Sequence, residues 1–263
     1  MSPTNKESHR PSPQRILFGV DEPIFDVLPE RVLSNLRLPT SENALLWNIT
    51  YPLAQPTINL LEILELRPLW GTRTLPEASE DNLTPYYWGY RVNGERLSQL
   101  DEVLELVDGP GLPTEVDLFL LGRHSLVLVE AKHMSGLGRC SRYTRRRCPE
   151  MHLLDDEMRR PCRYWQGVAA NFEVHLEFGP RPQPGKYAPA CNRHYQLART
   201  LLVGHALALR LERTFHMWLI VPRERWGSFE PNWMDFTQRV RDDGLWRRMR
   251  VLAWEEIRRL SGV

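Results

Sequence analysis

The chain has 263 residues, and 34 lysines and arginines against 33 aspartates and glutamates leave a formal net charge of +1. Hydrophobic residues make up 42% and charged residues 25%, the composition of an ordinary soluble globular protein, which excludes a histone-like polycation. No stretch reaches 18 apolar residues, so a membrane-spanning helix is excluded as well. The N-terminal residues lack the apolar core of a signal peptide, and four cysteines are too few for a disulfide scaffold. We therefore expect a cytoplasmic protein.

Residues 1–15 are polar and proline-rich, which predicts a disordered tail. No later segment resembles an interdomain linker, so we expect a single domain over residues 16–263. A stretch rich in cysteine and arginine, at about residues 136–191, is expected to be an insertion into that domain.

The first predicted helix begins at Thr40 or Ser41, either of which can cap it, and is broken by Pro52. A second helix is predicted over residues 57–64. The aromatic residues 86–90 are interpreted as core or edge strand rather than as a platform for stacking bases.

A β-hairpin is the clearest prediction. Two apolar runs, residues 116–121 and 126–132, lie on either side of a short turn that begins at Gly122. Further along the chain the predicted elements are a helix over 164–175, a loop over 179–189, a long helix over 193–213, strands over 215–221 and 250–254, and a helix over 255–260. This order predicts an α/β fold with a mixed sheet.

Charged residues interrupt the hydrophobic hairpin at three positions. Asp117 and Glu130 lie on adjacent strands, and Glu130 and Lys132, two apart, project from the same face. A carboxylate buried in a strand is costly unless it is paired or binds a cation. Two carboxylates suit Mg²⁺, which would polarise a phosphodiester, while Lys132 would position or deprotonate the attacking water. The alternative is a structural salt bridge among the three residues.

The same residues resemble the signature of the PD-(D/E)XK nuclease superfamily, in which an acid starts one strand and an acid-x-Lys triplet lies on the next. Residues 113–117 followed by Glu130-Ala131-Lys132 match it, although here the acid does not directly follow the proline. Glu42 matches a glutamate that the family often adds on the preceding helix. Residues 194–199 resemble a glutamine-containing helix found in a poorly characterised bacterial branch of restriction-type endonucleases.

The resemblance implies a restriction-endonuclease-like central mixed sheet flanked by helices, and metal-dependent hydrolysis of DNA. By position, Asp117, Glu130 and the Ala131 carbonyl would bind Mg²⁺ or Mn²⁺. Glu42 would bind a second metal or orient a water, and Gln196 would support the site. From the residues alone, a second interpretation of each is equally good. Glu42 would only interact favourably with the helix dipole, and Gln196 would be a solvated or capping side chain.

The four cysteines all follow Lys132. Thiolates can hold a structural zinc ion or, as the second choice, an iron–sulfur cluster, although no C-x-x-C pair is present. The alternative is four unrelated thiols. These candidate ligands are Cys140, Cys148, Cys162 and Cys191.

Arginines are concentrated directly after the predicted site, within residues 139–163. Next to a phosphodiester-cutting site they would contact the nucleic-acid backbone, although such runs are often only solvated. The leading hypothesis is thus a Mg²⁺-dependent deoxyribonuclease, more an endonuclease than an exonuclease and conceivably a homodimer, with no membrane partner. The alternatives are a noncatalytic nucleic-acid-binding protein that retains the fold, and an unrelated enzyme in which the hairpin acids form only an ion pair.

Overall fold

The computed structural model describes residues 15–38, 40–54, 58–72, 81–110, 113–152, 161–166, 171–185 and 187–261. The predicted tail, apart from Arg15, lies outside these residues.

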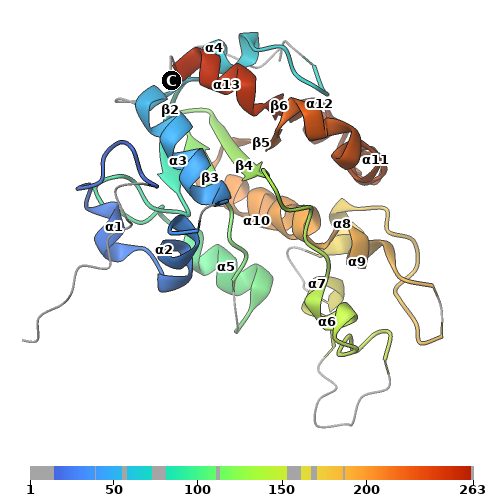
Figure 1. Cartoon of the computed structure of the whole chain (residues 1–263). Coiled ribbons are helices and arrows are strands. Elements are labelled where there is room, and N and C mark those ends of the chain that lie inside the picture. Colours follow the sequence, from blue (N-terminus) through green and yellow to red (C-terminus); the bar gives the residue numbers. More distant parts are fainter. Residues whose placement is uncertain are drawn as a thin grey trace, which may run out of the picture.

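The fold is built on one mixed β-sheet, whose strands follow one another in the order of the sequence (Figure 1). The strands are β1 (Ile58–Asn59), β2 (Asn82–Tyr87), β3 (Leu118–Leu121), β4 (Ser125–Ala131), β5 (Thr214–Val221) and β6 (Met249–Ala253). Neighbouring strands from β1 to β4 are antiparallel, whereas β4, β5 and β6 are parallel. This confirms the predicted α/β fold with a mixed sheet flanked by helices.

Helices cover both faces of the sheet. One face packs against α1 (Ile24–Val27), α2 (Glu30–Leu36), α3 (Glu42–Leu53), α4 (Leu60–Glu65) and α13 (Trp254–Ser261). The other packs against α5 (Leu100–Asp108), α7 (Arg163–Gln166), α8 (Phe172–His175), α10 (Tyr195–Leu211), α11 (Trp226–Thr237) and α12 (Asp243–Arg248). The remaining helices are α6 (Ser141–Thr144), α9 (Ala190–Arg193) and the 3₁₀ helix η2 (Arg223–Arg225).

The predicted hairpin is confirmed as β3 and β4, with Leu118 paired to Val129. Its turn is one residue shorter than predicted, because Ser125 already belongs to β4. Asp81 holds this turn, since its carboxylate accepts backbone N–H bonds from Arg123, His124 and Ser125 at 2.7 to 3.0 Å.

The helix predicted after residue 40 is α3, and Ser41 is its cap, accepting a hydrogen bond from the Ala44 N–H at 2.9 Å. The helix ends one residue after Pro52, so the predicted break lies close to its observed end. The proline lies in the last turn, and the helix continues to Leu53. The helix predicted over 57–64 is partly wrong, because Ile58 and Asn59 form β1 before α4 begins.

The long helix predicted over 193–213 is confirmed as α10. It packs tightly on β5, since a Cβ atom added at Gly204 would lie 2.0 Å from the Phe215 ring. The helix predicted over 164–175 is instead two short helices, α7 and α8, and residues 167–170 between them lie outside the described residues.

Arg250 on β6 is fully buried, and its guanidinium nitrogens find no hydrogen-bond partner within the described structure. The guanidinium lies over the Trp218 ring, with Cζ 5.9 Å from the ring centroid, in a cation–π contact. Burial lowers the pKa of Arg250 to about 10. Because an unpaired buried charge destabilises a fold, Arg250→Met is expected to stabilise the protein by about 1 to 3 kcal/mol. Thermal unfolding tests this, with exposed Arg247→Met as the control; an unchanged or lower Tm for Arg250→Met contradicts it.

Candidate functional site

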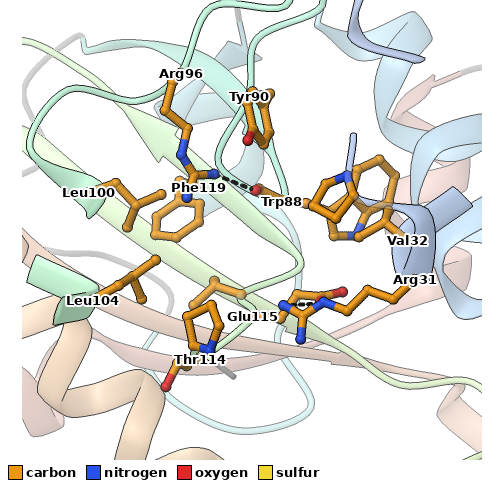
Figure 2. A pocket seen from close by; sticks show the side chains of 13 residues that line it. Arg31, Val32, Trp88, Tyr90, Arg96, Leu100, Leu104, Thr114, Glu115 and Phe119 are labelled. Atoms are coloured by element: carbon orange, nitrogen blue, oxygen red, sulfur yellow. Dashed lines mark hydrogen bonds and ion pairs between the residues drawn. The ribbon is translucent and has the colours of Figure 1, made fainter. Parts of the chain in front are cut away.

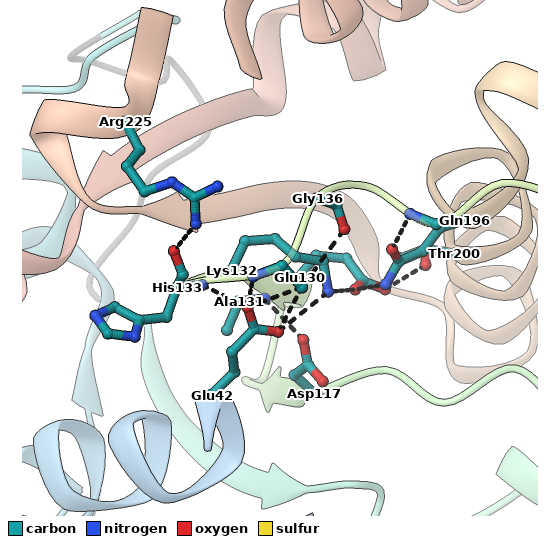
Figure 3. Close-up of polar contacts among 12 residues, drawn as sticks. Glu42, Asp117, Glu130, Ala131, Lys132, His133, Gly136, Gln196, Thr200 and Arg225 are labelled. Carbon is teal, nitrogen blue, oxygen red and sulfur yellow. Dashed lines mark hydrogen bonds and ion pairs between the residues drawn. The ribbon is translucent and has the colours of Figure 1, made fainter. Parts of the chain in front are cut away.

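The charged residues of the hairpin meet at the end of β4 (Figure 3). Asp117 directly precedes β3, and Glu130 is the penultimate residue of β4. Since Leu118 pairs with Val129, one step outward places Asp117 opposite Glu130 on the same face of the sheet. The two acids therefore do not lie on opposite faces of the sheet, the arrangement that would have separated them.

Glu130 is fully buried, and both of its oxygens accept hydrogen bonds from α10. The Thr200 hydroxyl donates to Oε1 at 2.6 Å, and the Gln196 amide donates to Oε2 at 2.7 Å. Burial, reinforced by the negative charge of Asp117, raises the pKa of Glu130 to about 8. At neutral pH the neutral acid is therefore favoured in the metal-free site, and a bound cation would favour the carboxylate.

Asp117 accepts a hydrogen bond from the Ala131 N–H at 2.8 Å. Its side chain is partly open to solvent. Burial nevertheless raises the pKa of Asp117, and Lys132 opposes this rise. The bond to Ala131 fixes the acid beside the backbone of the acid-x-Lys triplet.

Lys132 lies between the acids, with a side chain only 8% exposed. Its Nζ is 3.8 Å from Glu130 Oε2 and 3.9 Å from Glu42 Oε2, the outer range of an ion pair. Burial alone would lower the pKa of Lys132, but the surrounding carboxylates, first Asp117 and then Glu130, outweigh burial and raise it. The side chain therefore remains an ammonium and is poorly suited to deprotonate water.

Glu42, at the start of α3, is held by the loop that follows Lys132. Its Oε1 accepts backbone N–H bonds from His133 at 2.7 Å and Ser135 at 3.0 Å, and the Ser135 hydroxyl donates to the same oxygen at 2.8 Å. Although burial raises the pKa of Glu42, these donors and Lys132 bring it below its ordinary value. Glu42 thus belongs to the acidic cluster, and an interaction with the helix dipole alone does not account for its contacts. The His133 ring points away from the cluster (Figure 3).

Gln196 links the cluster to the arginine-rich segment. Its amide donates to Glu130, and its Oε1 accepts the Gly138 N–H at 2.8 Å. The interpretation of Gln196 as a solvated or capping residue is therefore wrong. Sequence reasoning missed Thr200 and Ser135. For Thr200 a signal existed, since it lies one helical turn after Gln196 on the same side of α10.

The charges of the site favour a divalent cation. Glu42, Asp117 and Glu130 face a single ammonium, so the ionised cluster carries two excess negative charges. Within the described residues, no group of three or more histidine, cysteine or acidic side chains is arranged to hold a metal. Mg²⁺ does not require one, because it is usually bound through one or two carboxylates and keeps several waters. Asp117, Glu130 and the Ala131 carbonyl fit this mode of binding.

Two hollows lie near the cluster. Glu42 and Ser135 line a pocket of about 370 Å³ between α2, the start of α3 and the loop at 134–135. A smaller cavity of about 70 Å³ lies beneath the Arg31–Glu115 ion pair, among the rings of Trp88 and Phe119 (Figure 2). Tyr86, Tyr87 and Trp88 are buried, which confirms the aromatic cluster as core. The larger pocket adjoins the cluster through Glu42, the one acid of the cluster among its described lining residues.

The cysteines lie away from this cluster. Cys148 is buried, and Cys140, Cys162 and Cys191 are partly buried; none forms a disulfide.

Comparisons with protein-family models, curated proteins and solved structures find no match for the chain. Within the described residues, no helix has the length and apolar character needed to cross a bilayer.

Proposed function

We propose that the protein is a metal-dependent nuclease that hydrolyses DNA phosphodiester bonds, with the fold and signature of the PD-(D/E)XK superfamily. The observation that carries the proposal is the convergence of Asp117, Glu130 and Glu42 on Lys132 at one end of the sheet. Each residue comes from the element that the resemblance implies: the start of β3, the end of β4, and the helix before the hairpin.

Asp117, Glu130 and the Ala131 carbonyl would hold Mg²⁺ or Mn²⁺. The bound ion would supply Lewis acidity toward the phosphate and lower the pKa of a water ligand. Thr200 and Gln196 aim the Glu130 carboxylate, and Ala131 aims Asp117. Glu42 would bind a second cation or orient a water; its Oε1 accepts three hydrogen bonds, and its Oε2 accepts one from the Ser135 hydroxyl at 3.0 Å.

Lys132 acts as a fixed positive charge in this proposal. The surrounding carboxylates raise its pKa in the metal-free site, and as an ammonium it would stabilise negative charge that develops on the phosphate and orient the attacking water. Its backbone is anchored on both sides: the N–H donates to the Ile220 carbonyl at 2.8 Å, and the carbonyl accepts from the Trp254 indole at 2.9 Å. This anchoring limits the positions available to the ammonium.

The arginine-rich segment would contact the DNA backbone. Its described, exposed arginines are Arg139, Arg142, Arg145, Arg146, Arg147 and Arg163. The segment leaves the site at Gly138, which bonds the same Gln196 that supports Glu130. Phosphates bound along it would therefore lead toward the acidic cluster, and binding is expected to weaken as salt increases.

The direct test is cleavage of plasmid DNA, of single- and double-stranded oligonucleotides and of RNA, with Mg²⁺ or Mn²⁺ and with EDTA. We expect metal-dependent DNA cleavage by the wild type and by Glu230→Gln, an exposed acid on α11 used as the control. We expect none from Asp117→Asn. If no nucleic acid is cleaved under any of these conditions while DNA binding remains salt-sensitive, the noncatalytic alternative replaces this proposal.

A further inference from the structure

The four cysteines come from separate stretches of the insertion but lie in one region beside α9. Cys140 precedes α6, Cys148 follows it, Cys162 precedes α7, and Cys191 is in α9. The Cys140 N–H donates to the carbonyl of Asn192, the neighbour of Cys191, at 3.2 Å. The Cys162 N–H donates to the carboxylate of Glu150, two residues after Cys148, at 2.9 Å. Two separate contacts thus bring the cysteine-bearing stretches together in pairs.

Hydrogen-bond donors lie near three of the four sulfur atoms, although burial, the larger effect, raises the pKa of each of these thiols. The Cys148 sulfur accepts backbone N–H bonds from Glu150 and Met151, and the Cys162 sulfur accepts one from Tyr164. Backbone donors aimed at sulfur stabilise the anionic form, as hydrogen bonds to a charged group do. The Trp165 indole N–H lies near Cys191, but it is buried and lacks a full hydrogen-bond partner. A thiolate at Cys191 would supply the missing acceptor.

The sulfur atoms also influence one another. Burial raises the pKa of Cys162 and of Cys191 to about 12; the nearby donors oppose this rise, and the other cysteines add to it. Cys191 is influenced by the other three cysteines, and Cys162 by Cys140 and Cys148, so all four lie within one electrostatic neighbourhood. Without a cation the thiols stay neutral, and the donors around them have no anion to bind.

We propose that Cys140, Cys148, Cys162 and Cys191 together ligate one metal centre that fastens the insertion to the start of α10. The shared chemistry is four thiolates, which suits a zinc ion or an iron–sulfur cluster. In the described structure the sulfurs are not yet at coordinating distances, so ligation requires them to move closer. The short helices around them, α6, α7 and α9, have four residues each and little regular structure to resist such a movement.

Nearby ion pairs fit this assignment. Glu150 is bonded by both Arg181 and the Cys162 N–H, so it ties the Cys148 turn to Cys162. A centre with four thiolates and one Zn²⁺ carries two negative charges, and the exposed arginines of the same segment would offset them. The centre would hold the insertion near Asn192, four residues before Gln196, and thereby order the arginines beside the acidic cluster.

The test is the metal content of the full chain purified without chelators, both in air and anaerobically. We expect about one zinc per chain, or about four irons with absorbance near 400 nm for an iron–sulfur cluster; either result supports a four-thiolate centre and tells the two apart. Cys162→Ser and Cys191→Ser are expected to lose most of the metal, whereas the neighbouring Ser141→Ala retains it. If a cysteine variant does not fold, release of the metal from the wild type by a thiol-modifying reagent replaces that comparison.

A metal-free chain with four reactive thiols, or with disulfides, would overturn the inference. So would a chain whose metal is retained in both cysteine variants. These readouts do not depend on DNA cleavage, so a failure here is distinct from a failure of the proposed nuclease function.

Discussion

Lys132→Met should lower metal-dependent DNA cleavage by about 10³-fold and leave metal binding intact or tighter. Methionine has a similar length and fits the buried position, but it removes the only ammonium among the three carboxylates. The loss of this positive charge favours binding of a divalent cation by the acids. It also removes a group that would stabilise the negative charge developing on the phosphate during cleavage. Single-turnover cleavage and a Mn²⁺ titration of the same protein measure the two effects separately.

Lower cleavage together with retained metal binding distinguishes a catalytic role of Lys132 from a purely structural one. If Lys132 served only as a structural ion pair, its removal would leave cleavage by the folded fraction unchanged. Cleavage by Lys132→Met within about tenfold of the wild type would contradict the proposed role, because a missing catalytic charge usually costs more than that.

Asp117→Asn should raise the thermal stability of the metal-free protein at alkaline pH while abolishing activity. The pKa of Glu130 is raised from 4.5 to about 8, first by burial and then by Asp117, and that of Asp117 is also raised. The folded state therefore favours the neutral acids, so it loses stability as the pH rises from the unfolded pKa through the folded one. Removing one acid lessens this loss by about 1 to 3 kcal/mol.

The measurement is Tm with EDTA between about pH 5 and about pH 9. We expect the advantage of Asp117→Asn over the wild type to grow with pH, and Mg²⁺ to raise the Tm of the wild type but not that of Asp117→Asn. Glu230→Gln should follow the wild type throughout. An Asp117→Asn protein less stable than the wild type at the alkaline end would show that Asp117 is needed structurally, against this account.

Much of the fold was predictable because its central elements carry strong local signals. The two apolar runs of the hairpin, the repeating leucines of α10 and the run over β5 each predict the element that the structure contains. The sequence analysis did not predict α11, which contains Gly227 and Pro231. There the burial of Phe229, Trp233 and Phe236 against the sheet overrides the local preference for a break.

The residues of the candidate site also differ in how far the sequence could predict them. Asp117, Glu130 and Lys132 were recognisable because charges are out of place in apolar strands. Ser135 was not, since a single hydroxyl in a loop is unremarkable until the tertiary fold brings it to a carboxylate, and Thr200 was indicated only by its spacing from Gln196. The roles of Glu42 and Gln196 stood open from the residues alone, and their contacts with Ser135 and Glu130 depend on packing between distant segments.

Titration of the metal-free protein with Mg²⁺ or Mn²⁺ by calorimetry, in parallel with Asp117→Asn and Glu230→Gln, tests most directly whether the acids form a cation site. The account predicts saturable binding to the wild type and to Glu230→Gln that is lost in Asp117→Asn. Equal binding to all three proteins, or no binding to the wild type, would contradict it.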